Sequence, residues 1–130
     1  MSEIIKTLKK LPDLLPLKSA TMTEISDAEI QLRLRFANDY KEYLNEFGAI
    51  MANGIELTGI AKSENRNVIF VTKQEWELNP QVPQNMYVME NVGIDGIIIW
   101  QDSDGAIYQS LPGKNPQKIF DNLVAYLKSK

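Results

Sequence analysis

The chain has 130 residues, a net charge of −3 and 44% hydrophobic residues, which fits one globular domain and excludes a disordered or collagen-like chain. It contains neither histidine nor cysteine, which excludes disulfides, Cys or His zinc sites, Cys nucleophiles and Ser-His-Asp triads. The charge is uneven, because residues 19–112 hold six basic and fourteen acidic groups, a net −8, whereas both ends are basic.

A short amphipathic helix is predicted over residues 3–11, because its apolar residues recur at helical spacing and Pro12 ends the pattern. Residues 12–23 contain a second proline and show no clear period, so we interpret them as a connector. We therefore assign residues 1–22 to an N-terminal helix and connector, and residues 23–130 to the core of one domain.

The next helix is predicted to start at Ser26, because Ser26 and Glu29 have the spacing of a capping box and Ile25 before the cap can pack on Ile30. We expect this helix to end near Leu34 and to bury Ile30 and Leu34, with Ala28 or Leu32 nearby.

A second helix is predicted from Asn38 or Asp39 to Gly48, a residue that readily supplies the left-handed helix stop. Four large residues fall at i, i+3, i+4 and i+7, the spacing of one buried face: Tyr40, Tyr43, Leu44 and Phe47. The sequence thus predicts two packed helices joined by a tight corner.

Strands are predicted where the apolar period changes to two or the sequence becomes rich in β-branched residues, at 55–60, 68–71, 86–89, 97–100 and 106–109. The strand at 97–100 is apolar on both faces, so we expect it at the centre of a sheet. The Asp102–Gly105 segment has hairpin-turn chemistry.

Two further helical segments are predicted in the second half of the chain. Thr72 and Glu75 repeat the capping-box spacing and predict a helical turn or two before Pro80. A terminal helix is predicted from Asn115, with its buried stripe between Ile119 and Leu127. Together these elements indicate an α+β fold, with a central, mainly antiparallel sheet of about five to six strands and helices packed around it.

The order of these motifs resembles the SUKH superfamily, which includes fungal cell-wall assembly regulators and many bacterial toxin-immunity proteins. The resemblance covers roughly residues 23–127 and rests on the order of several motifs: Ser26 to Ile30, Phe36 to Gly48, Ile55 to Ile60, Thr72 to Trp76, and Asn91 to Gly96 leading into Ile97 to Trp100 and the Asp104-Gly105 turn. Ala37 departs from the pattern, because the family commonly has proline before the second helix.

The resemblance implies a binding protein without catalytic residues. In bacteria such domains are antitoxins: each binds a cognate polymorphic toxin, often a nuclease, and blocks it in the cytoplasm. A regulatory or scaffold module with endogenous partners is the alternative, and an enzyme is disfavoured by the missing His and Cys. Because soft metal ligands and a nucleotide loop are absent, we expect no tightly bound metal or organic cofactor.

The acidic middle of the chain favours a basic protein partner over nucleic acid, whose phosphates it repels; ordinary solubility is the alternative explanation. No apolar stretch approaches the roughly 20 residues that cross a bilayer, and the first ten residues lack the apolar block of a signal peptide. We therefore expect a cytoplasmic protein that binds a basic toxin and no membrane. The sequence does not indicate its oligomeric state.

Eight residues are candidates for the partner contact. Seven are carboxylates expected on the sheet side and its edge turns, and one is a large aromatic of the kind that anchors interfaces: Glu56, Glu75, Trp76, Glu77, Glu90, Asp95, Asp102 and Asp104. Purely structural interpretations remain open. The tryptophan can belong to the core, and the last two aspartates fit a turn better than a calcium loop.

No catalytic residue and no metal ligand is assigned. Glu75 and Glu77 with Asp95 could form an acid/base pair only if they converge, and nothing in the sequence brings them together. The glycines of the Asn91–Gly96 segment are spaced like those of a phosphate loop, but the Lys-Ser/Thr pair is missing, which favours a bulged turn entering a strand.

Overall fold

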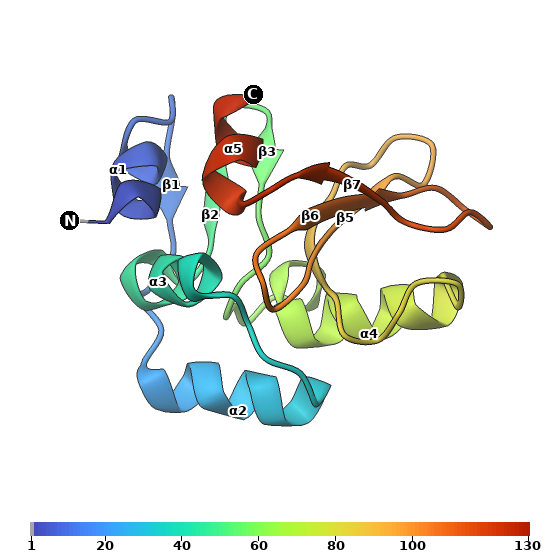
Figure 1. Ribbon diagram of the computed structural model, residues 1–130. Helices are drawn as coiled ribbons and strands as arrows, with labels where there is room; N and C mark the ends of the chain where they lie inside the picture. The colour runs from blue at the N-terminus through green and yellow to red at the C-terminus, as the bar shows by residue number, and fades with distance from the viewer. Residues whose placement is uncertain (1) are drawn as a thin grey trace.

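Two antiparallel sheets organise the computed structural model, which describes residues 2–130 (Figure 1). The smaller sheet has the order β1-β2-β3, with strands Leu15–Pro16, Ile50–Ala52 and Ile55–Glu56. The larger sheet has the order β4-β5-β6-β7, with strands Tyr87–Asn91, Ile98–Gln101, Ile107–Ser110 and Gln117–Phe120. The α+β class is confirmed, but the strands form two sheets and not the expected single one.

The larger sheet is a meander in which each strand pairs with the next along the chain. Strand β5 is buried at all four positions, as expected for an apolar strand covered on both faces. The turn before β6 is the predicted hairpin: the carboxylate of Asp102 accepts hydrogen bonds from the backbone N–H groups of Asp104 and Ala106, at 3.0 and 3.1 Å.

The first and third helices follow the predictions. Helix α1 spans Glu3–Lys9, and α3 spans Asn38–Phe47 with the predicted buried face. Gly48 ends α3 at φ 73°, and a Cβ atom there would lie 2.0 Å from the carbonyl oxygen of Lys18, so the close approach of the connector also requires glycine.

Helix α2 begins earlier than predicted. It spans Met22–Leu32, and its capping box is formed by Thr21 and Glu24, so Ser26 lies inside the helix and the predicted start was wrong. The earlier start accompanies a different buried stripe, made of Ile25, Ala28 and Leu32.

The predicted strand at 68–71 is wrong, because this segment opens helix α4, Val68–Leu78. The side-chain oxygen of Asn67 accepts hydrogen bonds from the N–H groups of Ile69 and Phe70, at 2.9 and 3.3 Å, and so caps the helix. Thr72 is therefore a buried helical residue and not a cap; its hydroxyl accepts a hydrogen bond from the N–H of Val88 in β4. Tertiary packing overrides the β propensity of a short β-branched run.

The C-terminal helix is also shorter than predicted. Residues from Gln117 to Phe120 form β7, and α5 spans Leu123–Lys128 with Asn122 as its cap. The predicted start at Asn115 was wrong, because the apolar residues of this segment pair as a strand with β6. A 3-10 turn, η1 at Glu64–Arg66, precedes α4.

The helices form layers around the sheets. In Figure 1, α3 and α4 lie between α2 and the sheets, so α2 is an outer helix, while α1 packs beside α3 and α5. A cluster of buried aromatic rings joins the α2–α3 corner to the larger sheet: Phe36, Tyr40, Tyr43 and Tyr87. Over residues 2–130, no helix has both the length and the apolar character needed to cross a membrane.

Candidate functional site

The structure brings two of the eight candidates together, Glu56 of β3 and Glu90 of β4. Glu90 is buried, and its Oε2 accepts a hydrogen bond from the backbone N–H of Glu56 at 2.8 Å. Its other oxygen accepts a hydrogen bond from the hydroxyl of Tyr126 and lies 3.8 Å from the Nζ of Lys130. Burial and the charge of Glu90 raise the pKa of Tyr126. Glu90 is thus part of an internal network, and only Glu56 is exposed.

Three candidates are consecutive on α4 and point in different directions. Glu75 is buried, accepts a hydrogen bond from the side-chain amide of Asn79 at 3.1 Å, and has a pKa raised by burial. Trp76 is half-buried, and its ring N–H donates to the carbonyl of Met86 at 3.0 Å. Glu77 is exposed. Of the three, Glu77 has the most accessible side chain.

The remaining candidates lie on two loops. Asp95 is exposed in the β4–β5 connection, at φ 53°, and Asp104 is exposed at the tip of the β5–β6 hairpin. The carboxylate of Asp102 serves the same hairpin and also accepts a hydrogen bond from the hydroxyl of Tyr108 at 3.2 Å. The eight candidates therefore come from several elements, and among the described residues hydrogen bonds join two pairs of them, Glu56 with Glu90 and Asp102 with Asp104.

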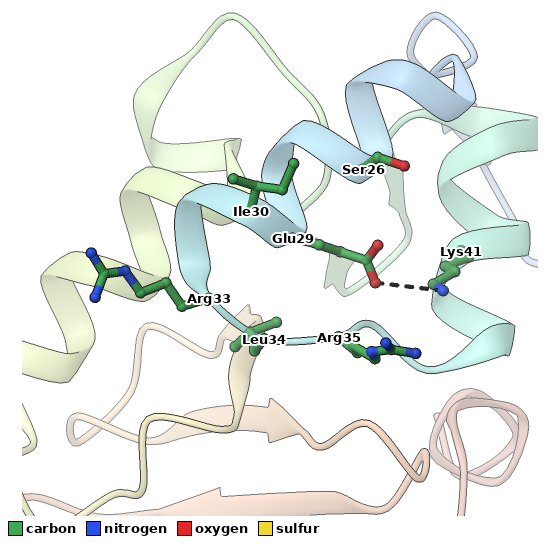
Figure 2. A pocket seen from close by; sticks show the side chains of 7 residues that line it. All are labelled: Ser26, Glu29, Ile30, Arg33, Leu34, Arg35 and Lys41. Carbon is green, nitrogen blue, oxygen red and sulfur yellow. Dashed lines mark ion pairs between the residues drawn. The ribbon is translucent and has the colours of Figure 1, made fainter.

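A surface hollow of about 460 Å³ lies where the outer face of α2 meets the α2–α3 corner (Figure 2). Its lining residues are mainly basic or apolar: Ser26, Glu29, Ile30, Arg33, Leu34, Arg35 and Lys41. Figure 2 shows Ile30 and Leu34 along the middle of the hollow, with Arg33 directed to one side of Leu34 and Arg35 to the other. We call this site the α2 hollow.

The burial pattern of α2 produces this hollow. Ile30 lies on the opposite side of the helix from Ala28, and its side chain is 73% exposed. Arg33 follows the helix in the left-handed conformation, at φ 56°, which reverses the chain and directs Leu34 back along the hollow. The predicted burial of Ile30 was wrong, and Leu34 is half-buried.

One carboxylate holds the wall of the α2 hollow together. The side chain of Glu29 accepts a hydrogen bond from the N–H of Phe36 at 2.8 Å and forms an ion pair with Lys41 at 3.5 Å. These contacts link α2, the corner and α3. They also neutralise Lys41 in part, which leaves two guanidinium groups, those of Arg33 and Arg35, as the uncompensated charges.

The α2 hollow was not predicted from the sequence, although the sequence holds a signal of it. Of the six basic residues between positions 19 and 112, three line this one site: Arg33, Arg35 and Lys41. Two of them sit within three residues of each other in an otherwise acidic segment. Because Ile30 and Leu34 were predicted to be buried, these basic residues were not recognised as the lining of an exposed site.

Apolar side chains continue from the α2 hollow in two directions. Towards the start of α2, Met22 is 59% exposed and shares a shallow hollow of about 400 Å³ with Ile30. Towards α4, a hollow of about 590 Å³ contains Gln31 and Phe70, and the phenylalanine is 41% exposed. The outer layer of helices thus presents several large apolar groups together.

Another polar site surrounds Arg66. Its guanidinium lies 3.7 Å from a carboxylate oxygen of Glu56, and two of its nitrogens, Nε and Nη2, are buried without a hydrogen-bond acceptor. The adjoining hollow has a volume of about 270 Å³. No cluster of three or more acidic side chains within residues 2–130 has a geometry that could hold a metal ion.

Comparisons with known proteins give one family and one close fold. A family model described as SMI1-KNR4 cell-wall matches residues 1–130. No curated protein matches the chain significantly. The crystal structure of a protein from Pseudomonas syringae pv. tomato is similar over 98% of this chain and 96% of that chain, with a TM-score of 0.73 and 15% sequence identity. At this identity the likeness shows the fold alone.

Proposed function

The chain belongs to the SMI1-KNR4 cell-wall family of the SUKH superfamily, and from this premise we propose that it is an immunity protein, which binds and neutralises a cognate polymorphic toxin in the cytoplasm. The proposal makes the protein a binding module and not an enzyme. A nuclease is the toxin class we favour, because many members of the superfamily oppose nucleases and because the acidic middle of the chain suits a basic partner.

One observation carries this proposal beyond family membership: the outer helical layer exposes large apolar side chains next to charged ones. Met22, Ile30 and Phe70 are accessible on α2 and α4, which are regular helices that pack against each other. Apolar anchors surrounded by polar groups on a rigid element are typical of protein interfaces. They favour a partner of substantial size.

The exposed carboxylates support a second, longer-range part of the mechanism. Glu56, Glu77, Asp95 and Asp104 are exposed on separate elements and together contribute to a negative surface. Such a surface raises the association rate with a basic partner without requiring that each carboxylate touches it. We therefore propose that these four groups steer the encounter, whereas Glu75 and Glu90 stabilise the fold.

Growth rescue tests the proposal. A candidate toxin domain, taken from a gene that neighbours the gene of this protein, is expressed with and without the protein, and we expect growth to be restored when the protein is present. Double charge reversal Glu77→Lys with Asp104→Lys should slow association at low salt, and the difference from wild type should shrink once the Debye length is about 8 Å or less. Lys118→Glu with Lys128→Glu changes the charge of exposed sites in the opposite direction and should not slow association under the same conditions. Failure of the wild-type protein to rescue growth contradicts the immunity function.

The description of the matching family as cell-wall favours a second candidate, a regulatory module with endogenous partners. The two functions differ in what the protein binds in a strain without the toxin gene. An immunity protein should be recovered alone from such a strain. A regulatory module should be recovered with the same partner whether or not the toxin gene is present.

A further inference from the structure

We propose that the α2 hollow binds an acidic segment of a partner protein, one that inserts a large apolar side chain between carboxylates. This inference rests on the proposed protein-binding function and specifies the chemistry recognised at one part of the surface. It differs from the attraction of a basic partner by the acidic middle of the chain, because here the charges are reversed.

The apolar part of the recognition comes from Ile30 and Leu34. Both line the hollow, and Ile30 is among the most exposed large apolar side chains of the described residues, at 73%. Covering such a side chain with an apolar group of a partner removes water from both surfaces, which favours binding. A volume of about 460 Å³ accommodates one aromatic or branched side chain with part of its backbone.

The polar part comes from the two arginines. Neither Arg33 nor Arg35 forms an ion pair within residues 2–130, whereas Lys41 already faces Glu29 at 3.5 Å. A free guanidinium binds a carboxylate through two parallel hydrogen bonds, a geometry that lysine does not offer. Because the two arginines lie on opposite sides of Leu34 in Figure 2, they match carboxylates on both sides of an apolar anchor.

The site is already formed without a partner. The hydrogen bond from the Phe36 N–H to Glu29 fixes the corner against α2, and the Glu29–Lys41 pair ties α3 to the same carboxylate. A wall that is held in this way loses little conformational freedom on binding, which lowers the cost of association.

Nucleic acid is the competing occupant of a site with two arginines. Its phosphates are disfavoured here because the hollow lies within a segment of net charge −8, whose long-range field repels a polyanion. A short acidic segment of a protein carries fewer charges and offers the apolar anchor that Ile30 and Leu34 require. An oligonucleotide therefore belongs in the test as a competing ligand.

The direct test is fluorescence anisotropy with the whole protein and a labelled peptide that carries one phenylalanine between paired glutamates. Two further probes are the same peptide with lysines in place of glutamates, and a single-stranded oligonucleotide of similar length. We expect the acidic peptide to bind at least about tenfold more tightly than either other probe, with an affinity that falls as salt rises. Equal binding of the two peptides, or preferred binding of the oligonucleotide, overturns the proposal.

Variants localise the effect. Arg33→Gln with Arg35→Gln should weaken binding of the acidic peptide about tenfold or more, because two charge-assisted contacts are lost. The matched control, Lys62→Gln with Lys114→Gln, removes the same charge from exposed sites outside the α2 hollow and should change the affinity less than twofold. The thermal midpoints of both double variants verify that they fold. The single variant Arg35→Gln measures separately how much Arg35 contributes to the affinity for the acidic peptide. Equal losses in the two double variants refute the site.

Growth rescue separates this inference from the proposed function. If the wild-type protein protects against the toxin and the Arg33→Gln, Arg35→Gln variant protects equally well, the immunity function stands and the α2 hollow is not its contact. If the acidic peptide binds at the hollow but the wild-type protein gives no protection, the site stands and the immunity function fails.

Discussion

The start of α2 offers a decisive pair of substitutions, Thr21→Ala and Ser26→Ala. Both residues precede a glutamate by three positions, so the sequence allows either to be the cap. In the structure, the hydroxyl of Thr21 accepts a hydrogen bond from the N–H of Glu24 at 3.1 Å, and the carboxylate of Glu24 accepts one from the N–H of Thr21 at 3.0 Å. Ser26 is an exposed residue inside the helix.

The magnitudes follow from these roles. Thr21→Ala leaves the N–H of Glu24 without its side-chain acceptor and should lower the free energy of unfolding by about 1 kcal/mol. Ser26→Ala replaces an exposed helical serine by the best helix former and should raise it by up to about 0.5 kcal/mol. With an unfolding entropy of about 270 cal/mol/K for a chain of this length, 1 kcal/mol corresponds to about 4 °C in the midpoint.

Thermal and urea denaturation followed by circular dichroism measure both changes. The hydrogen bonds from Thr21 lower the pKa of Glu24 below its ordinary value of 4.5. The stabilisation by this carboxylate is therefore complete above about pH 4.5 and is lost as the pH falls through the lowered pKa. The gap between wild type and Thr21→Ala should narrow in the same range. A loss of stability in Ser26→Ala with none in Thr21→Ala would refute the assigned start of α2.

Three further predictions concern buried polar groups. Tyr87→Phe should cost about 1–3 kcal/mol in urea denaturation, because the tyrosine hydroxyl accepts a hydrogen bond from the buried N–H of Ala37 at 3.0 Å; a smaller loss would mean that water replaces it. Arg66→Met should leave stability unchanged or raise it, since two buried guanidinium nitrogens lack acceptors, and a loss above about 1 kcal/mol contradicts this. For Asp39, burial raises the pKa of the carboxyl above its ordinary value of 3.8, so NMR titration should give a midpoint above that value. The contribution of Asp39 to stability should fall as the pH rises through the raised pKa, because the unfolded chain releases this proton more readily.

The sequence was most informative where several independent signals agreed. For α3, the spacing of four large side chains defined the buried face and Gly48 defined the end. Its predicted cap, Asn38 or Asp39, was wrong, because Ala37 precedes the helix and makes no side-chain cap. Within β5 and the hairpin after it, the continuous apolar run and the Asp-Gly turn likewise pointed to one structure.

The predictions failed where a short apolar run was judged by residue type alone. Residues 68–71 are β-branched or aromatic, and four residues do not distinguish a strand from a buried helical turn. The decisive feature was Asn67, whose side chain caps α4. Near the C-terminus the error was the reverse: Ile119 and Phe120 were assigned to the buried stripe of the terminal helix, but they belong to β7, which pairs with β6.

The site was less predictable than the fold, because exposure depends on how the helix is rotated. With a helix start at Ser26, the predicted buried face contained Ile30. With the observed cap at Thr21, the buried face contains Ile25 and Leu32. An error of five residues in the start of the helix thus accompanied an error in its buried face, and the exposure of Ile30 beside the two arginines was not predicted.

Helix α2 also carries more apolar residues than one contact can cover. Ile25, Ala28 and Leu32 are buried inside this chain, while Met22 and Ile30 remain exposed on the outside. Leaving two large apolar side chains in water gives the free protein no stability, and a helix that is apolar on a second face is typical of a helix with a second neighbour. The first neighbours are α3 and α4. No segment among residues 2–130 covers the other face, which supports the proposal that a partner molecule binds there and that the two arginines beside Leu34 select the charge of the segment it presents.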